Sequence, residues 1–184
     1  MLTDKLAVQN VLNKADVLYT EKEVYLAIDD MAATINQRLQ NTQPICLCVM
    51  VGGLIPSGQL IPRLTMPLEI DYIHATRYRG ETQGNELAWR KYPTLDLKDR
   101  TVLIIDDILD EGLTLQAIVE YCEQQGAKSV LTAVLVEKEL EKRKGLQQAD
   151  FIGLTVPDRY VFGFGMDYRE QLRHAPGIYA VNGL

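Results

Sequence analysis

One short stretch of the sequence gathers several acidic side chains. In "VLIIDDILDEGLTL", four apolar residues run directly into Asp106 and Asp107, and Asp110 follows shortly before Gly112. Carboxylates bind sugar hydroxyls, bind a divalent cation or accept a proton. Gly112 lets the backbone approach a ligand closely, and a helix that starts after it presents unpaired N–H groups to an anion. This pattern favours a phosphorylated sugar as the ligand.

The same spacing has a simpler interpretation. Paired acids after a hydrophobic strand also occur in solvated loops and in metal-binding pockets. The expected position favours a ligand site, because the loop 106–113 would lie at the carboxyl end of a strand, where parallel α/β sheets bind ligands. Thr114 adds a hydroxyl donor at the start of the helix. Spacing alone leaves both interpretations open.

The elements around this stretch predict an α/β fold. Residues 20–40 carry apolar side chains at steps of three and four, with Thr20 and Glu23 in capping-box spacing, and are predicted to form a helix. The wholly apolar run 45–51 is typical of a strand covered on both faces of a parallel sheet, with helical turns expected at 57–64.

A clearer unit surrounds the acidic stretch itself. A strand at 101–106, a helix at 114–125 that ends before Gly126 and a strand at 129–136 predict a right-handed β-α-β crossover. Further strands are expected at 68–78, 150–156, 160–166 and 177–181.

The segment 79–100 has no sustained apolar period and contains two glycines, a proline and many polar residues. It is therefore predicted to be a long surface loop, and long loops in compact domains often act as lids over a site.

Composition predicts one domain, residues 1–184, with 47% hydrophobic residues and a net charge of −6. Such a chain has no general basic field for nucleic acid or an anionic membrane. Three cysteines and two histidines favour buried thiols in a reducing cytoplasm over a disulfide framework or a zinc site. Charged residues interrupt the apolar ones near the N-terminus, unlike a signal peptide or a membrane span.

The acidic stretch resembles the phosphoribosyl pyrophosphate (PRPP) signature of type I phosphoribosyltransferases: four apolar residues, two acids, two apolar residues, Asp, a small residue, Gly and Thr. Glu111 departs from it, at a position that is usually threonine or serine. The tail "VPDRYVFGFGMDYREQLRHAPGIYAV" is similar to the purine-binding end of hypoxanthine-guanine phosphoribosyltransferases.

This resemblance implies an α/β fold with a parallel twisted sheet flanked by helices and a small hood formed from terminal segments. It implies transfer of 5-phosphoribosyl from PRPP to a 6-oxopurine, hypoxanthine and/or guanine, in purine salvage. The products would be IMP or GMP and pyrophosphate.

The resemblance also implies roles for individual residues. Asp106 and Asp107 would hold the ribose 2′- and 3′-hydroxyls, directly or through Mg²⁺. Asp110 would be the general base that accepts the proton of purine N7. The full set implied to bind PRPP is Val51, Gly52, Asp106, Asp107, Asp110, Glu111, Gly112, Leu113, Thr114 and Arg173.

The purine would be held mainly by the tail. Lys138 would donate to the 6-oxo group, Tyr160 would stack on the ring and the Val161 backbone would bond its edge. Asp167 would contribute at the purine end and as a second carboxylate for the metal, while Arg173 would meet the pyrophosphate. Without the resemblance, Tyr160 would fit a core position, and the run "EKELEKRK" around Lys138 would be a solvated charged face.

Two loops complete the implied site. "VMVGG", with Val51 and Gly52, corresponds to the pyrophosphate-binding loop, which often contains a non-proline cis peptide; Val51 stands where a lysine or arginine is frequent. Arg77 and Tyr78 begin the segment that matches the lid, which would exclude water from an oxocarbenium-like transition state.

Two other functions remain open at this level. One is a non-catalytic PRPP-sensing regulator of the same fold that binds nucleic acid. The other is a transferase for xanthine or a pyrimidine; Lys138 and "VPDRYV" favour a 6-oxopurine without separating hypoxanthine, guanine and xanthine. The resemblance further implies a cytoplasmic homodimer or homotetramer acting on small molecules, with neither nucleic acid nor membrane as partner.

Overall fold

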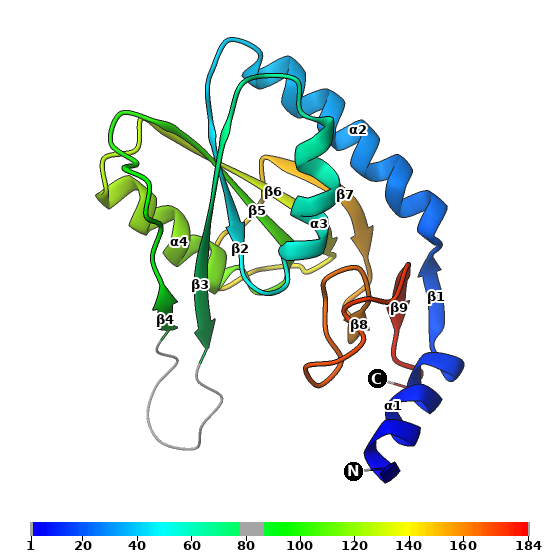
Figure 1. The fold of residues 1–184 in the computed structure, drawn as a ribbon. Coiled ribbons are helices and arrows are strands. Elements are labelled where there is room, and N and C mark those ends of the chain that lie inside the picture. Colours follow the sequence, from blue (N-terminus) through cyan, green and yellow to red (C-terminus); the bar gives the residue numbers. More distant parts are fainter. Residues whose placement is uncertain (1, 78–86, 184) are drawn as a thin grey trace.

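The computed structural model describes residues 2–77 and 87–183 (Figure 1). Within these residues, one six-stranded sheet has the order β4-β3-β2-β5-β6-β7. Neighbouring strands are parallel except β3 and β4, which are antiparallel. The strands are β2 (Ile45–Val49), β3 (Glu69–Arg77), β4 (Leu87–Lys91), β5 (Thr101–Leu109), β6 (Ser129–Lys138) and β7 (Phe151–Val156). The predicted parallel α/β fold is confirmed.

Helices cover both faces of this sheet (Figure 1). On one face lie α2 (Glu21–Leu39) and α3 (Leu54–Leu60), the latter followed by a 3₁₀ turn at Ile61–Arg63; α4 (Leu113–Gln124) lies on the other. Central strands covered on both faces are largely apolar, which explains the unbroken apolar runs at 45–49 in β2 and 102–105 in β5.

The alternation of side chains along β5 divides the core into two layers. Leu103 and Ile105 pack into the cluster that includes α2, whereas Val102 and Ile104 pack into the cluster that includes α4. Because successive side chains of a strand point to opposite faces, one strand supplies both layers.

Helix α2 begins as its sequence predicts. The Thr20 backbone N–H donates to Glu23 Oε2 at 2.8 Å, and the Glu23 N–H donates to Thr20 Oγ1 at 3.4 Å, which completes the capping box. Its buried side chains include Val24, Ile28 and Ile35.

Segments near the two ends of the chain form a second, smaller sheet. It has the order β1-β9-β8, with β1 (Asp16–Tyr19), β9 (Ile178–Ala180) and β8 (Val161–Phe162) paired antiparallel. Helix α1 (Leu2–Lys14) lies beside it (Figure 1). This is the hood of terminal segments that the family resemblance implies.

The prediction that the strand ends at Asp106 was wrong. β5 continues to Leu109, because its pairing with β6 runs on through Asp106↔Val134 to Leu109↔Glu137. The acidic pair therefore sits inside the strand, and only Asp110 and the residues after it lie in the connection to α4. The following strand β6 likewise reaches Lys138, two residues beyond its predicted end.

The prediction of one continuous loop at 79–100 was also wrong in part. Residues 87–91 form β4, an antiparallel edge strand whose Trp89 pairs with Ala75 of β3. The helix expected from residue 57 starts earlier, at Leu54. Helix α1 and strand β1 were not predicted, because the charged and polar residues that interrupt their apolar ones hide any clear period.

Two further predictions concern burial and membranes. Cys46, Cys48 and Cys122 are all buried free thiols, as predicted, and burial raises the pKa of Cys46 and Cys122 to about 12. Among the helices of the described ranges, none is both long and apolar enough to cross a lipid bilayer.

Candidate active site

The acidic pair lies at the carboxyl-terminal half of β5, buried between β2 and β6. Asp106 and Asp107 are 9% and 8% exposed, and the Asp107 N–H donates to Asp106 Oδ1 at 2.9 Å. Burial raises the pKa of Asp106 well above its ordinary value, and the charge of Asp107 raises it further. Burial also raises the pKa of Asp107, against hydrogen bonding by Asp106 and the positive charge of Arg173.

A cavity of about 160 Å³ opens beside this pair. It draws on β5, the turn after it, the end of β6 and the tail that contains β8. Its lining consists of Asp107, Ile108, Asp110, Lys138, Tyr160, Val161, Met166 and Asp167. Six of the predicted site residues, from three separate parts of the sequence, therefore meet at one cavity.

Lys138 lies between two carboxylates at this cavity. Its Nζ is 3.3 Å from Asp110 Oδ2 and 3.3 Å from Asp158 Oδ1, and its side chain is only 13% exposed. The interpretation of its charge run as a wholly solvated face was wrong, since Arg143 of the same run is 8% exposed. Both side chains contact Asp110 in the turn after β5, Lys138 through its carboxylate and Arg143 through its carbonyl.

The tail contributes an aromatic ring. Tyr160 is 37% exposed, and its ring meets that of Tyr168 edge-on, with centroids 5.7 Å apart. Next to it, Val161 is buried in β8 and aligned with Ala180 of β9. The ring of Tyr160 therefore keeps accessible surface at the cavity and is not a fully buried core side chain.

Arg173 ties the tail to the acidic pair. It donates through Nη1 to the Gly165 carbonyl at 2.7 Å and through Nη2 to Asp167 Oδ1 at 2.8 Å. The same guanidinium lies 3.9 Å from Asp107 Oδ2. Asp167 also accepts from the Glu170 N–H at 2.8 Å, so both of its oxygens are engaged.

The start of α4 has the geometry that its glycine predicts. Gly112 has φ +77, and a Cβ placed there would lie 2.7 Å from the Leu146 nitrogen. The chain at 145–146 packs against this turn, with the Leu146 N–H donating to the Gly112 carbonyl at 3.1 Å. Leu113 and Thr114 form the first turn of the helix, where N–H groups have no intrahelical acceptor.

Glu111, the departure from the resembled signature, forms an ion pair. Its Oε1 lies 2.6 Å from Lys144 Nζ. The lysine offsets the negative charge that would otherwise stand beside an anion at the start of α4.

The turn between β2 and α3 contacts the same acids. The Met50–Val51 peptide bond is cis, as the resemblance implied, and the Val51 side chain is 46% exposed. A Cβ on Gly52 would lie 2.5 Å from Asp107 Cγ, so only glycine fits this approach. Gly165 of the tail packs against Pro56 and Asp107 near the same point.

The predicted lid falls mostly outside the described residues. Arg77 is the last residue of β3, where it pairs with Leu87, and Tyr78 lies outside the described ranges.

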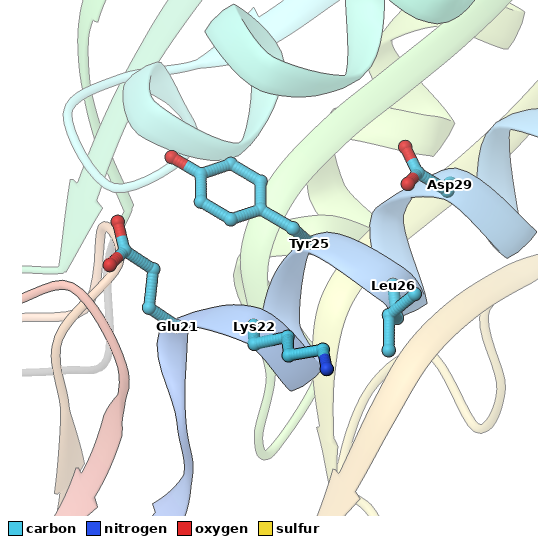
Figure 2. A pocket seen from close by; sticks show the side chains of 5 residues that line it. All are labelled: Glu21, Lys22, Tyr25, Leu26 and Asp29. Carbon is cyan, nitrogen blue, oxygen red and sulfur yellow. The ribbon is translucent and has the colours of Figure 1, made fainter.

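A second depression, of about 400 Å³, shares no lining residue with this cavity, and Figure 2 shows the side chains that line it. All of its lining residues belong to the first half of α2: Glu21, Lys22, Tyr25, Leu26 and Asp29. Although this depression is larger, one helix surface brings no groups together from different elements. We therefore take the smaller cavity at the ends of β5 and β6 as the candidate active site.

Sequence reasoning missed several residues at the site. Ile108 and Met166 line the cavity, and Asp158 shares Lys138 with Asp110. Asp158 lies two residues before Tyr160 in the tail, a signal that could have found it. Arg143 gives no such signal, because the sequence of a charged run does not indicate which of its residues is buried.

Comparison with known proteins agrees with this geometry. The profile of the family described as "Phosphoribosyl transferase domain" matches residues 14–171. The chain belongs to this family.

Individual similar proteins indicate which members of the family this chain resembles. The chain is 34% identical to the hypoxanthine-guanine phosphoribosyltransferase of Bacillus subtilis, over 88% of this chain and 90% of that protein. It is 28% identical to the hypoxanthine-guanine-xanthine phosphoribosyltransferase of Tritrichomonas foetus, over 88% of each. A crystal structure of a Staphylococcus aureus hypoxanthine phosphoribosyltransferase superposes with a TM-score of 0.84 at 30% identity and covers 90% of each chain. The resemblance to the hypoxanthine-guanine phosphoribosyltransferases is thus confirmed.

Proposed function

We propose that this protein transfers the 5-phosphoribosyl group of PRPP to N9 of a 6-oxopurine, hypoxanthine and/or guanine, in purine salvage. The anomeric C1′–O bond to pyrophosphate breaks, the N9–C1′ bond forms, and the purine loses its N7 proton. One observation carries the proposal: Asp110, Lys138 and Tyr160 lie at one cavity at the carboxyl end of the sheet.

The start of α4 is suited to the 5′-phosphate. The backbone from Asp110 to Leu115 and the hydroxyl of Thr114 would bind the phosphate oxygens, aided by the positive end of the helix. The Glu111–Lys144 ion pair supports this role, because it removes the repulsion that a bare carboxylate would exert on the phosphate.

The acids divide into two roles. Asp106 and Asp107, on β5, would bind the ribose 2′- and 3′-hydroxyls. Asp110, which is half exposed at the cavity, would accept the N7 proton and stabilise the positive charge that develops on the purine. Lys138, held 3.3 Å from Asp110, would donate to the 6-oxo oxygen.

The purine itself would lie on the ring of Tyr160, with its edge bonded by the Val161 backbone and Asp167 nearby. Backbone groups of Val51 and Gly52 together with Arg173 would face the pyrophosphate, and Arg77 and Tyr78 would begin the lid.

The donor set fits Mg²⁺. Within residues 2–77 and 87–183, no three His, Cys, Asp or Glu side chains converge to hold an ion by themselves. Mg²⁺, however, is commonly held by one or two carboxylates together with substrate phosphates and water. The buried pair Asp106 and Asp107, whose pKa values burial raises, would gain from a cation, and Asp167 would be the second metal-binding carboxylate. When bound, the ion would neutralise charge on the leaving pyrophosphate.

The alternative of a non-catalytic regulator is not favoured. The similar proteins that this chain matches over nine-tenths of their length are named as transferases. A xanthine preference stays open to test, since one such relative is named for xanthine as well. We also propose that the chain is a single domain and acts in the cytoplasm as a homodimer or homotetramer.

The test is an assay with PRPP, Mg²⁺ and, in turn, hypoxanthine, guanine, xanthine and adenine. Formation of IMP and GMP is expected, with little product from adenine. Product from none of the four bases would refute the proposal and favour the regulator.

A further inference from the structure

We propose that Arg143 is a positioning residue that fixes the position of Asp110 relative to Lys138. The proposal rests on the proposed function, in which these two groups act on neighbouring atoms of the purine, N7 and the 6-oxo oxygen. Arg143 is not among the residues that line the cavity, and it would act through the backbone carbonyls of the two residues.

The guanidinium of Arg143 donates to three backbone carbonyls from three places in the chain. Nε donates to the carbonyl of Asp110 at 3.0 Å, Nη1 to that of Gln147 at 2.8 Å, and Nη2 to that of Lys138. Nη2 also lies 3.4 Å from Glu137 Oε1, and the Arg143 side chain is 8% exposed. A buried guanidinium with this many acceptors is fixed in place.

Arg143 makes these hydrogen bonds just beyond the end of the β5–β6 pairing. The pairing of β5 with β6 ends at Leu109↔Glu137. The next residues are Asp110, in the turn after β5, and Lys138, the last residue of β6. Arg143 donates to the carbonyls of both. Lys138 is still paired with Val156 of β7, so its position is set by the sheet. Arg143 therefore links Asp110, in the turn after β5, to a residue that the sheet holds in place.

Arginine is required for this arrangement. Its planar group carries five N–H donors in a rigid fork, whereas lysine offers three donors from a single atom. A lysine at position 143 would keep the positive charge beside Glu137 and still could not span the carbonyls of Asp110, Lys138 and Gln147. Displacement of a reacting group by about 1 Å can cost about 100-fold in rate.

The experiment compares Arg143→Lys with Arg63→Lys. Arg63 is a matched control, because it also joins a carboxylate, Asp29 at 2.5 Å, to a backbone carbonyl, that of Gln59 at 2.6 Å, away from the cavity. We expect Arg143→Lys to lower kcat/KM for the purine about 10- to 100-fold, and Arg63→Lys to leave it within about 2-fold.

A double-mutant cycle separates positioning from general stability. If Arg143 acts by placing Lys138 against Asp110, Arg143→Lys should lower kcat/KM for the purine less than about 3-fold in a Lys138→Gln background. Glu137→Gln removes the charge partner and leaves the carbonyl contacts, so it should lower the melting temperature without lowering kcat/KM. Arg143→Gln, which keeps two N–H donors, serves as a second variant if the lysine variant does not fold.

The outcomes are distinct. An active wild-type protein in which Arg143→Lys behaves like Arg63→Lys would overturn this inference alone, as would full additivity with Lys138→Gln. A wild-type protein that forms no nucleotide would overturn the proposed function together with this inference.

Discussion

Replacing Asp106 by asparagine should stabilise the protein near neutral pH while lowering its activity. Asp106 is 9% exposed, and burial, followed by the charge of Asp107, raises its pKa. Asparagine has the same shape and keeps an oxygen that can accept the Asp107 N–H now bonded at 2.9 Å. The substitution therefore removes a desolvated charge without removing its hydrogen bond.

The sign of the pH dependence follows from the raised pKa. Well below pH 3.8, the ordinary value for aspartate, Asp106 is protonated in both folded and unfolded chains, so wild type and variant should be similarly stable. As pH rises through the elevated folded pKa, the wild type loses stability relative to the variant. Removing the cost of a desolvated charge is therefore expected to stabilise the variant at pH 8, by an amount on the order of 1–3 kcal/mol.

Urea unfolding of wild type and Asp106→Asn at several pH values between 3.5 and 8 measures this difference. Asp71→Asn provides a control of opposite sign. Burial acts to raise the pKa of Asp71, but hydrogen bonds from the N–H groups of Leu95, Tyr72 and Thr94 lower it overall. Its contribution to stability is present above its unfolded pKa and is lost as pH falls through its folded value, so Asp71→Asn should destabilise at pH 8. A loss of stability in Asp106→Asn at pH 8 would refute the reasoning.

Three further substitutions test the proposed roles. Asp110→Asn should reduce kcat about 10²- to 10⁴-fold, the range for a general base, with PRPP binding by calorimetry nearly unchanged; unaltered turnover would remove Asp110 as the base. Tyr160→Ala should raise KM for the purine more than KM for PRPP, by about 5- to 150-fold for a stacking contact worth ~1–3 kcal/mol, and the reverse pattern would contradict stacking. Gly52→Ala would overlap the Asp107 carboxylate and should destabilise by about 1–3 kcal/mol and raise KM for PRPP. Gly58→Ala, where a Cβ meets nothing within 4 Å, is its control and should leave both values unchanged or stabilise slightly.

Local signals in the sequence predicted the elements that depend on local physics. The capping box fixed the start of α2, and the apolar runs identified β2 and β5 as central strands. What local signals missed depends on partners far along the chain. β5 extends past its acids because β6 pairs with it, and β4 forms in a polar segment because β3 offers an open edge.

The site shows the same division. The carboxylates of the acidic stretch could be assigned to a site from their position after a strand, and the resemblance then supplied the tail residues at the same cavity. The burial of Arg143 and the sharing of Lys138 between Asp110 and Asp158 arise only when the chain after β6 folds back on the turn after β5. The sequence of a charged run does not indicate which of its side chains will donate to backbone carbonyls.

That returning segment also accounts for the departure at Glu111. Arg143 anchors it beneath the turn, the Gly145 N–H donates to the Glu111 carbonyl at 2.9 Å, and Lys144, between them, reaches the Glu111 carboxylate. A carboxylate beside a proposed phosphate site would oppose an anion by itself. Because the segment that orders the turn also brings the compensating lysine, the acid at position 111 and the charged run at the end of β6 are best understood as one arrangement. A substitution at Lys144 should therefore weaken PRPP binding more than a substitution at the neighbouring Lys142.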